Sequence, residues 1–132
     1  MAADRLRVLL VILVAIQVAL CQDSVIKYQI MEGASVGTVI GDVAVDSGLL
    51  SDNPPSALQG IDYILLDDTG AFISSHPYFS INKDTGIMST NAEIDRETLC
   101  PGQPLCEVNL DVAATSSATF FQVIGITLTI ID

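Results

Sequence analysis

The chain has 132 residues, a length that allows one domain of ordinary size. Acidic residues outnumber lysine and arginine by 16 to 5, and the net charge of −11 argues against a nucleic-acid partner, because nucleic-acid-binding proteins present basic surfaces to phosphate. Half of the residues are apolar, which is too many for a disordered chain.

Residues 1–21 predict a secretory signal peptide. Two arginines precede a run, residues 8–20, that is apolar at all but one position. This run is too short to span a bilayer but has the length of a secretory apolar segment. We expect cleavage after Cys21, which leaves residues 22–132 with no second run long enough for a membrane span. A lipidated Cys21 is the alternative, although Leu20 is larger than such sites usually accept.

The rest of the chain has the pattern of β-strands. Apolar and polar residues alternate, and β-branched residues are frequent. Clusters of Asp, Asn, Pro, Thr and Gly separate the candidates, and residues 43–50 favour one or two turns of helix. Seven short strands at this spacing predict an all-β sandwich. The expected strands are residues 25–31, 35–40, 61–66, 78–82, 87–90, 108–112 and 123–132.

Cys100 and Cys106 are predicted to form a disulfide. Signal cleavage removes Cys21 and leaves an even pair in an oxidising compartment. The intervening residues contain two prolines and a glycine, which favour a tight turn. A zinc site is disfavoured, because His76 is the only histidine and lies far away in the sequence.

Three acidic residues are candidate ligands for a metal ion. In an extended backbone, Asp95 and Glu97 would project to the same side, with Arg96 opposite. Glu32 ends the first predicted strand. If the sandwich brings Glu32 to the same end, three carboxylates converge, and hard oxygen ligands of this kind suit calcium. The alternative is that these are ordinary solvated acids and that Arg96 pairs with a neighbour.

The chain resembles the first extracellular cadherin repeat of a protocadherin. Residues 28–49 are similar to the family's opening, with a Glu after the first strand, a Val-Gly pair and an Asp-x-Gly-Leu turn. Residues 78–100 are similar to its Phe-x-Ile-Asn-x-x-Thr-Gly segment, followed by Ile-Asp-Arg-Glu and Leu-Cys. Two cysteines with five residues between them, after Asp-Arg-Glu, point to protocadherins, and the chain closes on the family's Ile-Ile-Asp.

The resemblance implies a Greek-key sandwich in which Glu32, Asp95 and Glu97 bind calcium. Met31 stands where the family often has proline, and Gly33 stands where a second acid is common, but neither change removes a ligand. The family's Asp-x-Asn-Asp-Asn linker is absent from this sequence. We therefore expect water to complete the calcium shell and the affinity to be weak, near the millimolar end of the usual range.

The resemblance also implies a function in calcium-dependent cell–cell adhesion. Its partners would be another copy of the same cadherin, in a homophilic contact, and the next cadherin repeat. The protein would be extracellular, either at the cell surface or secreted. On this interpretation residues 22–132 form a single repeat that ends before the calcium-binding linker, and the chain is a fragment of a longer protein.

Two alternatives to adhesion are an enzyme and a protein-binding domain without metal. Residues 68–70 and 84–86 both read Asp-Thr-Gly, as in retroviral-type aspartic proteases, but the copies are too close to form one dyad, and a hairpin turn explains both. Nothing marks a serine near His76 as an activated nucleophile. We therefore do not expect an enzyme. A secreted β-sandwich that binds a protein partner without metal remains the second alternative.

Overall fold

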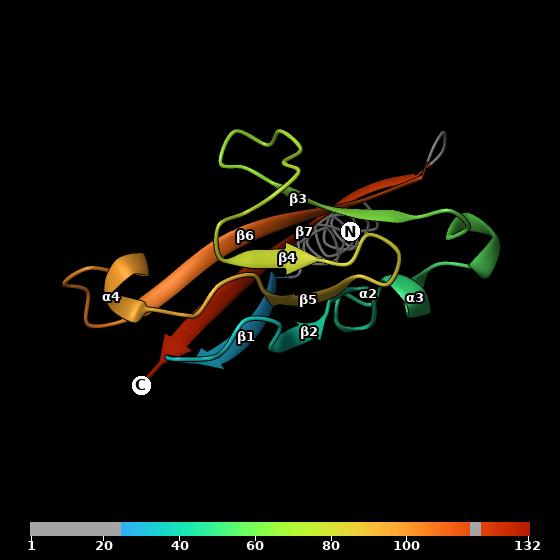
Figure 1. The fold of residues 1–132 in the computed structure, drawn as a ribbon. Helices are drawn as coiled ribbons and strands as arrows, with labels where there is room; N and C mark the ends of the chain where they lie inside the picture. The colour runs from blue at the N-terminus through green and yellow to red at the C-terminus, as the bar shows by residue number, and fades with distance from the viewer. Residues whose placement is uncertain (1–24, 117–119) are drawn as a thin grey trace, which may run out of the picture.

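The computed structural model describes residues 25–116 and 120–132, so the predicted signal peptide, residues 1–21, lies outside the described part. The described residues form seven strands and four short helical turns (Figure 1). The strands are β1 (Val25–Met31), β2 (Val39–Asp42), β3 (Asp62–Leu66), β4 (Phe79–Ile81), β5 (Ile87–Thr90), β6 (Cys106–Ser116) and β7 (Phe120–Ile131). The helical turns are α2 (Val43–Asp46), α3 (Leu49–Asp52), η1 (Pro55–Ala57) and α4 (Arg96–Leu99).

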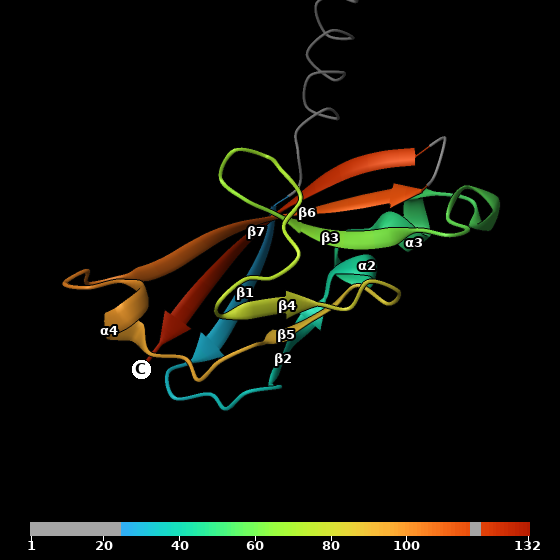
Figure 2. The same ribbon diagram turned by 45° about the horizontal axis from the view of Figure 1, so that its top comes forward.

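The strands form two sheets that pack face to face, and the predicted all-β sandwich is confirmed. One sheet has the order β1-β7-β6-β3 and the other has the order β2-β5-β4 (Figure 2). All neighbouring strands run antiparallel except β1, which lies parallel to β7 from Val25, opposite Gly125, to Met31, opposite Ile131. The first and last strands of the chain are therefore neighbours and end together.

The inward-facing side chains of β7 form the centre of the core. Ile124, Ile126, Leu128 and Ile130 are all at most 2% exposed, while the residues between them face outward. Burial of each such side chain stabilises the fold by about 1.5–3 kcal/mol. These inward and outward faces are those expected from the alternation of apolar and polar residues along a half-buried strand.

The second strand begins later than the sequence pattern predicts. Residues 35–38 form a turn in which the Thr38 side chain donates a hydrogen bond of 2.7 Å to the Ser35 carbonyl. Gly37 in this turn has φ of 86°, so the chain cannot continue as a strand until Val39. The helical character predicted for residues 43–50 is confirmed as α2 and α3, whereas α4 was not predicted.

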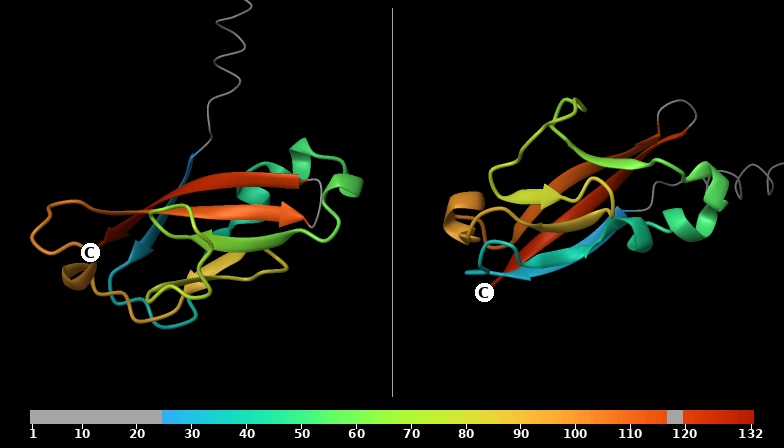
Figure 3. Two further views of the ribbon diagram at one scale, coloured as in Figure 1. Left: turned by 90° about the horizontal axis from the view of Figure 1, so that it is seen from above. Right: turned by 45° about the vertical axis from the view of Figure 1, so that its right-hand side comes forward.

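The two ends of the sandwich carry different structures. The end of β1, the helical turn α4 and the C-terminus lie together at one end, and α2 and α3 lie at the other (Figures 1 and 3). The connections between strands thus gather residues from distant parts of the chain, and the end that contains α4 also contains the acids singled out in the sequence.

Both Asp-Thr-Gly sequences form turns, as the hairpin interpretation predicts. Asp67 Oδ1 accepts hydrogen bonds from the backbone N–H groups of Thr69 and Ala71, at 2.8 and 3.0 Å. Asn82 Oδ1 accepts hydrogen bonds from the backbone N–H groups of Asp84 and Thr85, at 2.9 and 3.0 Å. In each turn a short polar side chain binds the main chain a few residues later, which is the usual role of Asp and Asn in turns.

The glycines that close these two turns are expected to respond differently to alanine. Both have positive φ, 84° at Gly70 and 77° at Gly86, which costs alanine about 1–2 kcal/mol. A Cβ at Gly70 meets nothing within 4 Å, whereas one at Gly86 lies 3.1 Å from Ala44 Cβ. In urea unfolding, Gly86→Ala should lower the free energy of unfolding by about 1 kcal/mol or more beyond Gly70→Ala. Equal losses would show that the space around Gly86 adapts freely.

Candidate functional site

Glu32 lies at the end of the sandwich where β1 and β7 finish. Its backbone N–H donates to the Ile131 carbonyl at 2.7 Å, which continues the parallel pairing by one residue. The next two residues bind the segment before α4, since Gly33 N–H donates to the Ile94 carbonyl at 2.8 Å and Ile94 N–H donates to the Ala34 carbonyl at 3.1 Å. These bonds fix Glu32 against the residue that precedes Asp95.

Asp95 caps the N-terminus of α4. Its Oδ1 accepts a hydrogen bond from the Glu97 N–H at 3.1 Å, and its Oδ2 accepts one from the Thr98 hydroxyl at 2.8 Å. The expectation that the chain stays extended from Asp95 to Glu97 is therefore wrong, because Asp95 is extended but caps a helical turn that starts at Arg96. The two acids reach this end of the molecule by the geometry of a helix start and not by strand alternation.

The Glu32 carboxyl lies among other negative groups. Its hydrogen bond with the Asp132 carboxyl, some loss of hydration and the charge of Asp132 raise the pKa of Glu32 above its ordinary value. The backbone N–H of Arg96 donates to Glu32 and opposes this shift, while the charge of Asp95 adds to it. Asp132 is a contributor that we did not predict, although the pairing of β1 with β7 places it next to Glu32.

The donor set at this end fits a hard divalent cation only in part. Glu32, Asp95 and Asp132 offer carboxylate oxygens, the ligands that calcium prefers, and the negative charges of Asp132 and Asp95 contribute to the raised pKa of Glu32. Within the described residues, no three acidic, histidine or cysteine side chains are arranged closely enough to hold a metal ion by themselves. The Glu97 carboxylate forms no hydrogen bond or ion pair within the same ranges.

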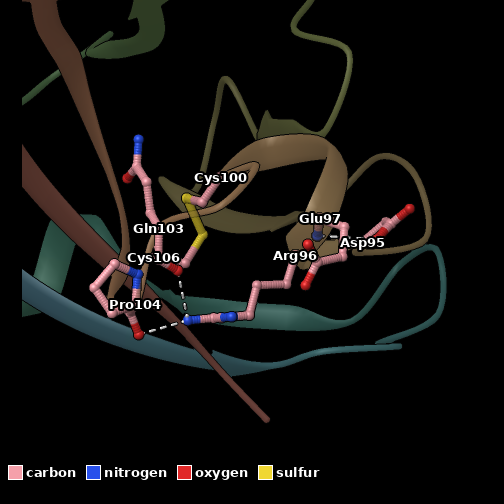
Figure 4. Close-up of a disulfide and its surroundings, with 7 residues drawn as sticks. All are labelled: Asp95, Arg96, Glu97, Cys100, Gln103, Pro104 and Cys106. Atoms are coloured by element: carbon pink, nitrogen blue, oxygen red, sulfur yellow. Dashed lines mark hydrogen bonds between the residues drawn. A yellow bond between two sulfur atoms is a disulfide. The ribbon is translucent and has the colours of Figure 1, made fainter.

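Arg96 does not neutralise these acids. Its guanidinium Nη2 donates to the carbonyls of Gln103 and Pro104, at 3.2 and 2.7 Å, and points away from Asp95 (Figure 4). The ion pair found in the described part of the chain joins Lys83 and Asp62, 3.9 Å apart. The alternative that Arg96 pairs with a neighbouring carboxylate is therefore wrong.

The loop bound by Arg96 is closed by the predicted disulfide. Cys100 and Cys106 are bonded, with their Cα atoms 5.4 Å apart, and both are at most 3% exposed. Cys100 follows α4 directly, and Cys106 is the first residue of β6. The disulfide therefore links the end of α4, at the candidate site, covalently to the four-stranded sheet that contains β6.

His76 orders the turn before β4. Its Nδ1 accepts hydrogen bonds from the backbone N–H groups of Tyr78 and Phe79, at 3.0 and 3.3 Å. Burial lowers the pKa of this half-buried imidazole, although the charge of Asp68 opposes the shift. The neutral ring thus stabilises the turn before β4.

Comparisons with known proteins all find similarity to cadherins or protocadherins. A family model described as cadherin-like matches residues 60–116. Human protocadherin gamma-B4 is 28% identical over 122 residues, which cover 92% of this chain and 12% of the relative. Human protocadherin-10 is 31% identical over 100 residues, which cover 76% of this chain and 9% of the relative.

The fold is similar to solved protocadherin structures. The structure of mouse clustered PcdhgC3 EC1-3 matches with a TM-score of 0.55 and 27% identity, over 80% of this chain and 30% of that one. The chain spans about a tenth of the length of the two curated relatives. No helix in the described ranges has the length and apolar character needed to cross a membrane.

The raised pKa of Glu32 predicts a specific dependence of stability on pH. The folded state holds the Glu32 proton more tightly than the unfolded state, so this group's contribution to stability falls as pH rises through the raised pKa. Glu32→Gln should therefore increase the melting temperature at pH 7 in the presence of a chelator. The increase should shrink as the pH is lowered to about 4, just below the ordinary pKa of glutamate, where Glu32 is mostly protonated in both states.

The control for this prediction is Asp84→Asn, which removes one charge from the turn between β4 and β5 at the other end of the sandwich. Thermal unfolding of both variants between pH 4 and pH 8 separates the local effect from the effect of net charge. If Glu32→Gln and Asp84→Asn change the melting temperature equally at every pH, the carboxylates at the C-terminal end do not repel one another measurably.

Removal of the disulfide should destabilise the fold moderately. The bond closes a short loop between residues six apart, for which chain entropy gives about 2–2.5 kcal/mol. The double variant Cys100→Ser/Cys106→Ser should lose about that amount in urea unfolding, and reduction of the wild-type protein should have a similar effect. A loss near zero would mean that the loop is held equally well without the bond.

Proposed function

We propose that this chain, a protocadherin-like repeat of the cadherin family, is a calcium-dependent cell–cell adhesion module. The family assignment rests on the match to the cadherin-like model and on the protocadherin relatives and structures. The chain spans only about a tenth of the length of the two relatives, so we assign their adhesive activity to it as part of this proposal. We assign it the role of a first extracellular repeat.

The calcium ligands in this proposal are Glu32, Asp95 and Glu97. The observation that carries it is the position of Glu32, held by main-chain hydrogen bonds against the segment of Asp95 and placed beside Asp132 by the pairing of β1 with β7. Three side chains do not fill the six to eight positions around calcium. Water or a following repeat would supply the others, so binding by this chain alone is weak.

Each of the three acids has a different part in the proposal. Glu32 provides a carboxylate from the loop after β1, and Asp95 provides one while it caps α4. Glu97, on the first turn of α4, leaves its carboxylate free for a ligand. A bound calcium ion would supply positive charge and oxygen coordination that replace the repulsion between the acids. The junction with the next repeat would then become stiffer.

The proposal extends to processing and partners. Residues 1–21 would direct secretion and be removed, and residues 22–132 would form one repeat outside the cell. The partners are the next cadherin repeat and another copy of the same cadherin in a homophilic contact. Recognition spread over several repeats would make the single repeat a poor adhesive by itself.

The test is thermal unfolding with and without about 5 mM calcium chloride. If the dissociation constant is near 1 mM, mass action stabilises the fold by about 1 kcal/mol, which raises the melting temperature by about 4–8 °C. The double variant Glu32→Gln/Glu97→Gln should lose this increase. The matched control, Asp68→Asn/Asp84→Asn, removes two acids from the turns on either side of β4 and should keep it.

Two outcomes would contradict the proposal. No increase in the wild-type protein would favour the metal-free sandwich. An increase that survives in Glu32→Gln/Glu97→Gln would place calcium elsewhere on the acidic surface. Magnesium at the same concentration serves as a second control, since it requires near-ideal octahedral geometry and gives up its water reluctantly.

A further inference from the structure

The helical turn α4 and its N-cap residue supply two of the proposed ligands, but this turn is too short to be stable alone. It has four residues, and a single turn fixes several backbone angles in return for very few hydrogen bonds. Its position must therefore come from contacts with the rest of the molecule. These contacts decide how well Asp95 and Glu97 are oriented.

The two ends of α4 are fixed by different means. At the N-terminal end, Ile94 is bound through its main chain to Gly33 and Ala34. At the C-terminal end, Cys100 N–H donates to the Arg96 carbonyl at 2.8 Å, and the disulfide joins Cys100 to the first residue of β6. The bonds at the two ends leave the loop of residues 101–105 to be ordered by other contacts.

Arg96 supplies that order. Its guanidinium reaches across the loop to the carbonyls of Gln103 and Pro104 (Figure 4). Hydrogen bonds from a charged donor are stronger than neutral ones. Arg96 thus joins the disulfide loop, through its side chain, to the helical turn that Asp95 caps and that contains Glu97.

We infer that Arg96 is a positioning residue for the calcium site, whose guanidinium holds the 100–106 loop against α4 and so keeps Asp95 and Glu97 in place. This inference rests on the proposed function. Arg96 does not itself bind the metal. A competing hypothesis predicts the opposite effect of Arg96 on calcium affinity. A cation so close to the site should by its charge alone repel calcium, so its removal would tighten binding.

The test is calorimetric titration of the purified full chain with calcium chloride. Arg96→Met keeps an unbranched, helix-compatible side chain but removes the charge and the donors. Loss of a group that orients metal ligands typically weakens metal affinity about tenfold or more, and we expect a change of about tenfold for Arg96→Met. The matched control is Lys83→Met, which removes the same charge from an exposed side chain paired with Asp62. Its dissociation constant should be unchanged or slightly lower.

A second variant and a second measurement keep the inference testable if Arg96→Met folds poorly. Arg96→Lys retains the charge but lacks the planar guanidinium, so its dissociation constant should lie between those of the wild type and Arg96→Met. Hydrogen exchange without calcium should be faster in both variants at the backbone N–H groups of Leu99 and Gln103, which are bonded to the carbonyls of Asp95 and Cys100. Exchange in Lys83→Met should match the wild type.

The outcomes separate this inference from the proposed function. A wild-type chain that does not bind calcium overturns the proposed function. A wild-type chain that binds, with Arg96→Met binding equally or more tightly, leaves the function standing and overturns the positioning role. A lower melting temperature with an unchanged dissociation constant also overturns it, because Arg96 would then only stabilise the fold.

Discussion

The parallel pairing of β1 with β7 is the constraint on which the rest of the structure depends. Because Val25 lies opposite Gly125 and Met31 opposite Ile131, both strands finish at the same end of the sandwich. That register brings Glu32 next to Asp132, and the hydrogen bonds of the following loop add the segment before Asp95. A shift of one residue would turn the inward face of β1 outward and also separate these acids.

Much of the fold could be predicted because alternation in strands is a local property of the sequence. The inward face of β7 follows directly from the order of its residues, and the turns around Asp67 and Asn82 follow from the chemistry of short polar side chains. The start of β2 could not be predicted in this way, because Val36 and Val39 look equally suited to a strand. The positive φ of Gly37 is what ends the turn and delays the strand.

For the candidate site, the sequence predicts that Glu32 and Asp95 reach the same end of the sandwich, but it predicts neither the local backbone geometry nor the contribution of Asp132. Glu32 and Asp95 were found from their positions in the motifs, and the structure brings their segments together. The alternation argument for Asp95 and Glu97 gave the wrong backbone, because an aspartate followed by polar residues starts a helical turn as readily as it continues a strand. The direction taken by the Arg96 side chain depends on a loop whose carbonyls have no signature in the sequence.

The disulfide has a consequence for biosynthesis in the oxidising compartment that we expect for this protein. Its two cysteines are only six residues apart, so their thiols meet frequently even in the unfolded chain, where closing a short loop costs little entropy. Oxidation therefore need not wait for the sandwich to assemble. The nascent protein can enter folding with this covalent ring already made. If the predicted signal cleavage removes Cys21, the slow search for long-range strand partners then proceeds without a free thiol.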